Sequence, residues 1–167
     1  AKGLPYKSAG YLNSAIQIAL SVHRKDLLMQ LLAESALNYC QNYQIEEARQ
    51  VIKYLDATVQ ENEDSLLVAV TSLVKGYLMQ NDKKTGLAIG HFTASQLYSG
   101  KLWTLSTKSQ LAQAVIIAQH DPGGAEEAIE KVLRSTDNKK GVSFVVSPTL
   151  LRLAELYRKS NEDFMAS

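Results

Sequence analysis

The chain has 167 residues, of which 46% are hydrophobic and 21% are charged. These values lie close to those of ordinary globular proteins and exclude a disordered chain, a collagen and a membrane bundle. Lys and Arg number 18 and Asp and Glu 17, for a formal net charge of +1. Because both signs are interspersed along the chain, direct binding of nucleic acid is not expected. The 9 Gly and 3 Pro are too few for the frequent turns of a β-sandwich and favour long helices.

Cysteine content and hydrophobic runs bear on where the protein is found. Cys40 is the single cysteine, so no intrachain disulfide or cysteine zinc cluster can form, and a reducing compartment is expected. The densest apolar runs are far shorter than the about 20 residues of a membrane-spanning helix. We therefore expect an intracellular, cytoplasmic protein, with a nuclear location left open and no membrane insertion. The opening Ala1-Lys2-Gly3 has no initiator Met and no signal-peptide pattern, which suggests a fragment of a larger protein.

Apolar residues recur at helical spacing along nearly the whole chain. The spacing predicts about eight helices in four consecutive pairs, at residues 9–41, 45–79, 84–119 and 125–159. Within these pairs Asp26 is the predicted N-cap of the second helix. The acidic run 61–64 is the predicted loop and cap of the fourth helix, and residues 121–124 form the strongest predicted turn, between the sixth and seventh helices.

Residues 142–146, Val-Ser-Phe-Val-Val, prefer extended structure locally. Since no second run of this kind can pair with them, the prediction is an extended linker that packs its apolar side chains, rather than a strand. Ser147 and Pro148 are then expected to begin the last helix, as N-cap and first helical residue. Gly76 and Gly90 fall inside predicted helices, where close packing offers an explanation for a glycine.

A period of forty residues runs through the chain. An Ala recurs at this spacing with a large apolar residue four positions later, in the pairs Ala48 and Ile52, Ala88 and Phe92, and Ala128 and Val132. Twelve positions before each Ala stand Ala36, Gly76 and Ile116. A small residue lets the two helices of a hairpin approach closely, and a bulky residue one turn later fills the space between successive hairpins.

These residues resemble the tetratricopeptide repeat, a pattern of small, aromatic and bulky residues on a pair of helices. The best match is Leu32, Ser35, Ala36, Tyr39, Ala48 and Ile52. The second copy matches less fully, and Ile116 is large where the family prefers a small residue. A period of forty is longer than the common period of about 34 and is similar to the longer-helix variants found in cargo adaptors and cell-division scaffolds.

The resemblance implies an all-α fold, in which antiparallel helix hairpins stack as a right-handed α-solenoid. It covers about residues 12–134, and residues 1–167 would form a single domain. Another kind of helical array and a single irregular bundle remain as alternatives.

No pattern in the chain indicates catalysis or metal binding. His23, His91 and His120 are scattered, without the spacing that would place two ligands on one helical face. Cys40 lies on an apolar stripe, which favours a buried and inert thiol over a nucleophile. We therefore expect that the protein is not an enzyme and uses no cofactor and no metal.

The resemblance also implies a partner-binding groove, because the first helices of stacked hairpins line the concave face. Its predicted lining is Gln30, Ala33, Leu37, Gln41, Leu73, Tyr77, Gln80, Gln113, Ile117 and His120. Such a lining is apolar with amide edges and little charge, which suits an amphipathic helix or an extended apolar segment. The alternative is that the chain covers this groove itself, with Phe144, Val145 and Val146.

The sequence thus predicts a non-catalytic protein-interaction scaffold that binds a peptide, a helix or a partner subunit within a larger complex. The alternative is a regulatory or sensor module that binds a small ligand or signal peptide and controls an attached effector domain. No sequence feature indicates an oligomeric state.

Overall fold

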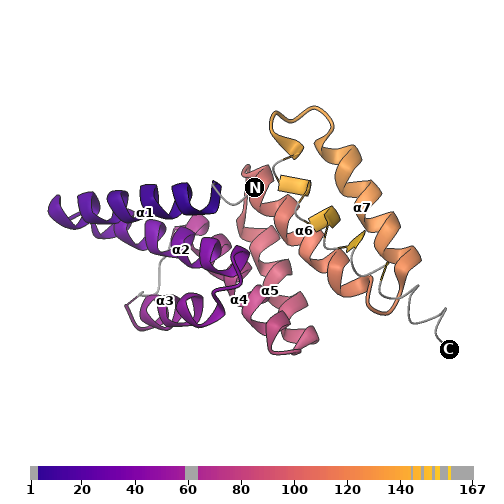
Figure 1. Cartoon of the computed structure of the whole chain (residues 1–167), viewed down its shortest axis with the longest axis horizontal. Coiled ribbons are helices and arrows are strands. Elements are labelled where there is room, and N and C mark those ends of the chain that lie inside the picture. Colours follow the sequence, from indigo (N-terminus) through magenta and orange to yellow (C-terminus); the bar gives the residue numbers. More distant parts are fainter. Residues whose placement is uncertain are drawn as a thin grey trace. The chain divides into compact units, whose positions relative to one another are not determined.

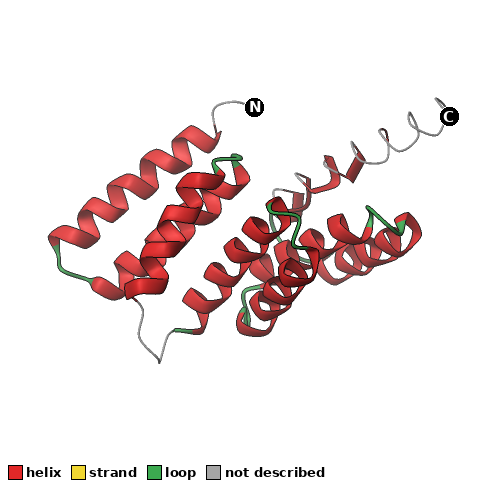
Figure 2. Cartoon of the chain, turned by 90° about the horizontal axis from the view of Figure 1, so that it is seen from below, coloured by secondary structure: helices red, strands yellow, loops and turns green. Residues whose placement is uncertain are grey.

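The computed structural model describes residues 4–58, 64–143, 145–147, 149–151, 153, 154 and 158, with side chains described from residue 10 onward except at residue 122. This part of the chain is all-α, with eight helices packed mainly against their sequence neighbours (Figures 1 and 2). Seven have defined bounds: α1 Leu4–Ser21, α2 Lys25–Gln41, α3 Ile45–Thr58, α4 Ser65–Asn81, α5 Thr85–Tyr98, α6 Trp103–Ile117 and α7 Pro122–Thr136. The eighth is helical at its described residues between 142 and 158.

The chain divides into two compact units, Ala1–Gly100 and Lys101–Ser167, which are described separately. In the first unit α2 packs against α1, α3 and α4, and α4 also packs against α3 and α5. The most extensive contact is between α4 and α5. Because α2 and α4 each have several neighbours, half of the apolar positions of α2 and most of those of α4 are buried inside the unit.

Three tight connections in the first unit share one geometry. His23, Tyr43 and Lys83 each have a left-handed backbone, with φ of 54°, 61° and 59°. Each donates its N–H to the carbonyl oxygen three residues earlier, and the next residue donates to the carbonyl oxygen five residues earlier. This is the Schellman pattern, which satisfies the free carbonyls at the end of a helix. It reverses the chain within three residues and so makes hairpins of α1–α2, α2–α3 and α4–α5.

A close approach between α4 and α5 forms the centre of the α4–α5 hairpin. Phe92 is fully buried, and a Cβ atom at Gly76 would lie 2.3 Å from its ring carbon Cε1. Tyr77 meets the same ring edge to face, with 5.4 Å between ring centroids and 70° between planes. Gly76 is therefore required by packing, as the sequence predicts. Gly90 is not, because no described atom apart from its own helix backbone and chain neighbours lies within 4 Å of the Cβ position there.

The second unit contains the α6–α7 hairpin and the eighth helix. Asp121 caps α7 by accepting a hydrogen bond from the N–H of Gly124 at 3.0 Å, in the turn that the sequence predicts. One apolar cluster joins Val115, Ala118, Ala125 and Leu153. A second cluster joins Leu111, Val132 and Val146, with Val142 packed against it.

The predicted extended linker at 142–146 is wrong. Val142, Ser143 and residues 145–147 are helical, while Phe144 lies outside the described residues. Val142 and Val146 are four residues apart, so a helix places both on the face that packs against Leu111 and Val132. Burial on that face outweighs the local preference of valine for strands. Ser147 is itself helical and is not an N-cap, and Pro148 lies outside the described residues.

None of the described helices combines the length and the apolar character needed to cross a membrane.

Candidate functional site

Three residues of the predicted groove are part of the core of the first unit. Ala33 and Leu73 are fully buried, and Leu37 is 2% exposed. They lie on α2 and α4, the two helices with the most neighbours in this unit, so packing within the chain uses their apolar surface. These three side chains are closed to a partner as long as the unit is folded.

The other four predicted groove residues of this unit reach the surface. Gln41 is exposed, and Gln30, Tyr77 and Gln80 are half-buried. Gln41 and Gln80 lie in the last turns of α2 and α4, which pack against each other. The Nε2 atom of Gln80 is buried and has no hydrogen-bond partner among the described residues. The surface that remains of the predicted groove is therefore aromatic and amide in character, without charge.

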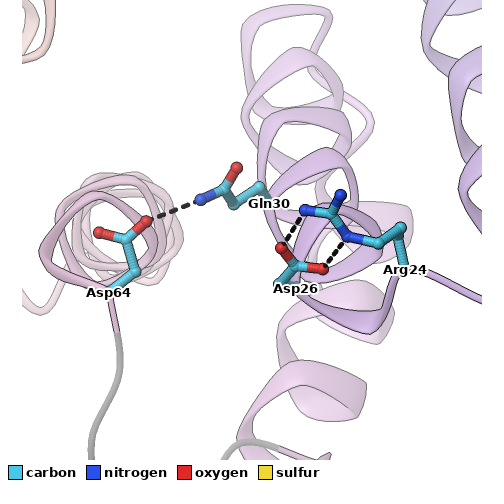
Figure 3. A network of polar contacts seen from close by, with 4 residues as sticks. All are labelled: Arg24, Asp26, Gln30 and Asp64. Carbon is cyan, nitrogen blue, oxygen red and sulfur yellow. Dashed lines mark hydrogen bonds and ion pairs between the residues drawn. The ribbon is translucent and has the colours of Figure 1, made fainter.

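Gln30, on α2, forms a hydrogen bond with a residue at the start of α4 (Figure 3). Its Nε2 donates to Asp64 Oδ2 at 2.7 Å, while Asp64 Oδ1 accepts from the N–H of Leu66 at 3.1 Å. Asp64 thus caps α4, as predicted, and ties it to α2. The predicted N-cap of α2 is wrong, because that helix begins one residue before Asp26. Asp26 instead accepts two hydrogen bonds from the Arg24 guanidinium, at 2.9 and 2.6 Å, which lower its pKa.

Two ion pairs also join α3 to α4. Arg49 and Asp82 make a bidentate pair with distances of 3.0 and 3.3 Å, and Lys75 Nζ lies 2.7 Å from Asp56 Oδ1. Hydrogen bonding to Arg49 lowers the pKa of Asp82, and the same bond raises the pKa of the guanidinium. These charged groups pair with one another, and the pairs link the α2–α3 hairpin to the α4–α5 hairpin.

In the second unit the predicted groove residues have three different environments. Gln113 is half-buried and His120 is exposed. Ile117 is half-buried and packs against the cluster of Val115, Ala118, Ala125 and Leu153. Val146, expected as a cover for the groove, belongs to the other cluster of this unit.

The described residues contain no arrangement typical of catalysis or metal binding. No three His, Cys, Asp or Glu side chains within the described ranges come together as ligands for a metal ion. Cys40 is buried, and desolvation raises the pKa of its thiol to about 12, so the thiol remains protonated near neutral pH. Burial lowers the pKa of His91, and the charge of Lys75 acts in the same direction.

One exposed surface was missed by the sequence reasoning: the outward face of α5. It consists of Gly86, Gly90, Thr93 and Leu97, with Leu87, Ile89 and Tyr98 beside them, and we call it the α5 face. Residues 85–98 include no Asp, Glu, Lys or Arg. That absence of charge was the available signal. Sequence alone, however, does not show which side of an uncharged helix is turned outward.

The chain was compared with protein-family models, with curated proteins and with solved structures, and none of them matches it.

Proposed function

We propose that this chain is a non-catalytic protein-interaction scaffold, built from tetratricopeptide-like hairpins, that binds a peptide, a helix or a partner subunit within a larger complex. The observation that carries the proposal is the equivalence of two hairpins. The helices α2 and α4 each have 17 residues and begin at residues 25 and 65, forty apart. The helices α3 and α5 each have 14 residues and begin at residues 45 and 85, again forty apart.

The neighbours of each helix support the same proposal. In stacked hairpins, the first helix of one hairpin packs against the first helix of the next. Here α2 packs against α4, and α3 against α4. Such stacks present the first helices as a surface on which a partner segment can lie.

The partner surface that we propose in the first unit consists of Gln41, Tyr77 and Gln80. Tyr77 and Gln80 are three residues apart on α4 and are therefore neighbours on its surface. A partly exposed aromatic ring offers apolar contact area, and the exposed amide of Gln41 can donate to and accept from the backbone of an extended peptide. The absence of charge fits an apolar segment or an amphipathic helix better than an acidic tail.

A site-specific cross-linking experiment tests this proposal. A photoreactive amino acid replaces Gln41 in the full chain, and extracts of the native host provide the partners. The matched control carries the same group at Gln50, an exposed residue on the outward side of α3. We expect a discrete protein adduct at position 41 that is absent at position 50.

Two outcomes would overturn the scaffold proposal. Equal adducts at both positions would show that position 41 is not a specific contact. A melting temperature raised by a small molecule, with no adduct at position 41, would instead favour the regulatory module. Thermal unfolding of both labelled chains checks that the substitutions leave the fold intact.

A further inference from the structure

The α5 face forms a narrow uncharged stripe. Gly86, Gly90, Thr93 and Leu97 follow one another at intervals of four, three and four residues, which places them on one line of the helix. Leu97 is 76% exposed and Leu87 is 58% exposed. The stripe thus combines two positions without side chains and one large apolar side chain that projects into solvent.

The helix α3 provides an internal control, because it has the same length and lies forty residues earlier. The positions of α3 that match the stripe are Glu46, Gln50, Lys53 and Ala57, and all four are exposed. Two of them are charged and one carries an amide, as is usual for a solvated helix face. The two helices match in their buried positions and differ on this outward line.

The two glycines of the stripe have no packing reason within the described chain. Apart from the helix's own backbone and each glycine's chain neighbours, no described atom lies within 4 Å of a Cβ built at Gly86 or at Gly90. Glycine inside a helix is less favourable than alanine, so such positions usually serve a close approach. Gly76 illustrates that use, since Phe92 occupies the space of its missing side chain. Gly90 offers similar space, and no described residue fills it.

We propose that the α5 face is a dimerisation surface, on which α5 of one copy packs antiparallel against α5 of a second copy. A surface that pairs with itself must contain both the projecting group and the space that receives it. Leu97 and Gly90 lie on the same stripe, seven residues or about 10 Å apart. A two-fold axis between Thr93 and Ala94 would place Leu97 of each copy over Gly90 of the other. Pairing this face with itself buries no charge.

The contact is small. A helix of 14 residues is about 21 Å long, and two such helices bury less than the roughly 1,200–2,000 Å² of a standard stable interface. The dimer is therefore weak and forms with rising concentration. It uses a different helix from the partner surface on α2 and α4, so the two proposals stand or fall separately.

Sedimentation velocity of the full chain over a concentration series up to about 1 mM tests the proposal. The wild-type chain is expected to show a reversible dimer, and Leu97→Glu is expected to weaken it at least tenfold, because it places two carboxylates in the contact. The matched control Ala57→Glu, at the same position of α3, is expected to leave dimerisation unchanged. A wild-type chain that stays monomeric, or equal effects of both variants, would overturn the proposal.

Gly90→Ala gives a second test with two opposite signs. In dilute monomer the variant is expected to melt at a higher temperature, because alanine favours the helix and meets no described neighbour. In the concentration series it is expected to dimerise several-fold more weakly, because the new methyl group fills the space for Leu97. Unchanged or stronger dimerisation would contradict the close approach.

Melting temperatures also test whether another part of the same chain covers the α5 face. If Leu97→Glu lowered the melting temperature of the dilute monomer, the α5 face would be covered within one chain, and the proposal would be overturned. An unchanged melting temperature, together with weaker dimerisation, is the expected result.

Discussion

The hairpins α2–α3 and α4–α5 have helices of the same lengths at the same spacing, yet they use different packing and have different outward faces. At matching positions the first hairpin has Ala36 and Ile52, whereas the second has Gly76 and Phe92. The outward line is charged and polar on α3 and uncharged on α5. The buried positions of a hairpin are constrained in pairs, because a larger residue on one helix requires a smaller one on the other. The residues of the outward line do not pack against a neighbouring helix, so they can differ between the hairpins without disturbing the core.

The largest expected effect comes from emptying the centre of the second hairpin. Phe92→Ala should lower the free energy of unfolding by about 3–5 kcal/mol, because a fully buried ring is lost and a cavity remains. Ile52→Ala, in the first hairpin, should cost less because it removes fewer buried atoms. Urea unfolding followed by circular dichroism measures both variants. A smaller cost for Phe92→Ala than for Ile52→Ala would break the distinction between the hairpins.

The same substitution at two helical glycines should have opposite signs. Gly76→Ala should destabilise the chain by about 1–3 kcal/mol, because its Cβ meets Phe92 at 2.3 Å. Gly90→Ala should stabilise the dilute monomer by about 0.5–1 kcal/mol, because only helix propensity changes. Chemical unfolding of both variants tests this. A stabilising Gly76→Ala would mean that α4 and α5 separate easily, against the close approach described above.

A smaller effect is expected at the ion pair between the hairpins. The Arg49 guanidinium lowers the pKa of Asp82 in the folded chain, so the folded state binds its proton less readily than the unfolded state. The resulting stability is complete above the ordinary carboxyl pKa of about 3.9 and is lost as pH falls from there through the lower folded value. Wild type should therefore lose more stability than Asp82→Asn between about pH 5 and pH 2. Equal losses would show that the pair does not stabilise the contact.

The smallest effect concerns His91, which occupies the position of Val51 in the first hairpin. Burial and the neighbouring Lys75 lower its pKa, and the charge of Asp56 acts against them. Below the ordinary pKa of about 6.5 the unfolded chain binds a proton at this histidine more readily than the folded chain does. The stability of the folded chain is therefore highest above that pH and falls as pH drops toward the folded pKa. His91→Val should remove this dependence, measured as the difference in melting temperature between about pH 7.5 and pH 5. An unchanged difference would place the pH sensitivity elsewhere.

The helices themselves could be predicted from the sequence. Helical periodicity and turn residues are local signals, which is why α2 to α7 lie close to their predicted positions. The helical state of Val142 and Val146 could not be read in this way, because it depends on burial against Leu111 and Val132. Their local preference for strands indicates the opposite.

The candidate site was predicted only in part, for the same reason. The sequence places Leu37 on the second helix and Leu73 and Tyr77 on the fourth, and these residues do lie on α2 and α4. It does not show that α2 and α4 bury Leu37 and Leu73 and leave Tyr77 half-exposed. Periodicity marks the apolar positions of a helix, whereas the neighbours of that helix decide which of them remain open.

By itself, the sequence determined an all-helical chain and the need for a small residue at Gly76. These features depend on spacing along the chain and on side-chain size, which are both written in the residues. Only the tertiary structure decided that the glycines at 86 and 90 have no described neighbour and that Leu97 is 76% exposed. Whether a side chain is exposed depends on how all the helices pack against one another. For that reason the α5 face could not be predicted from the sequence alone.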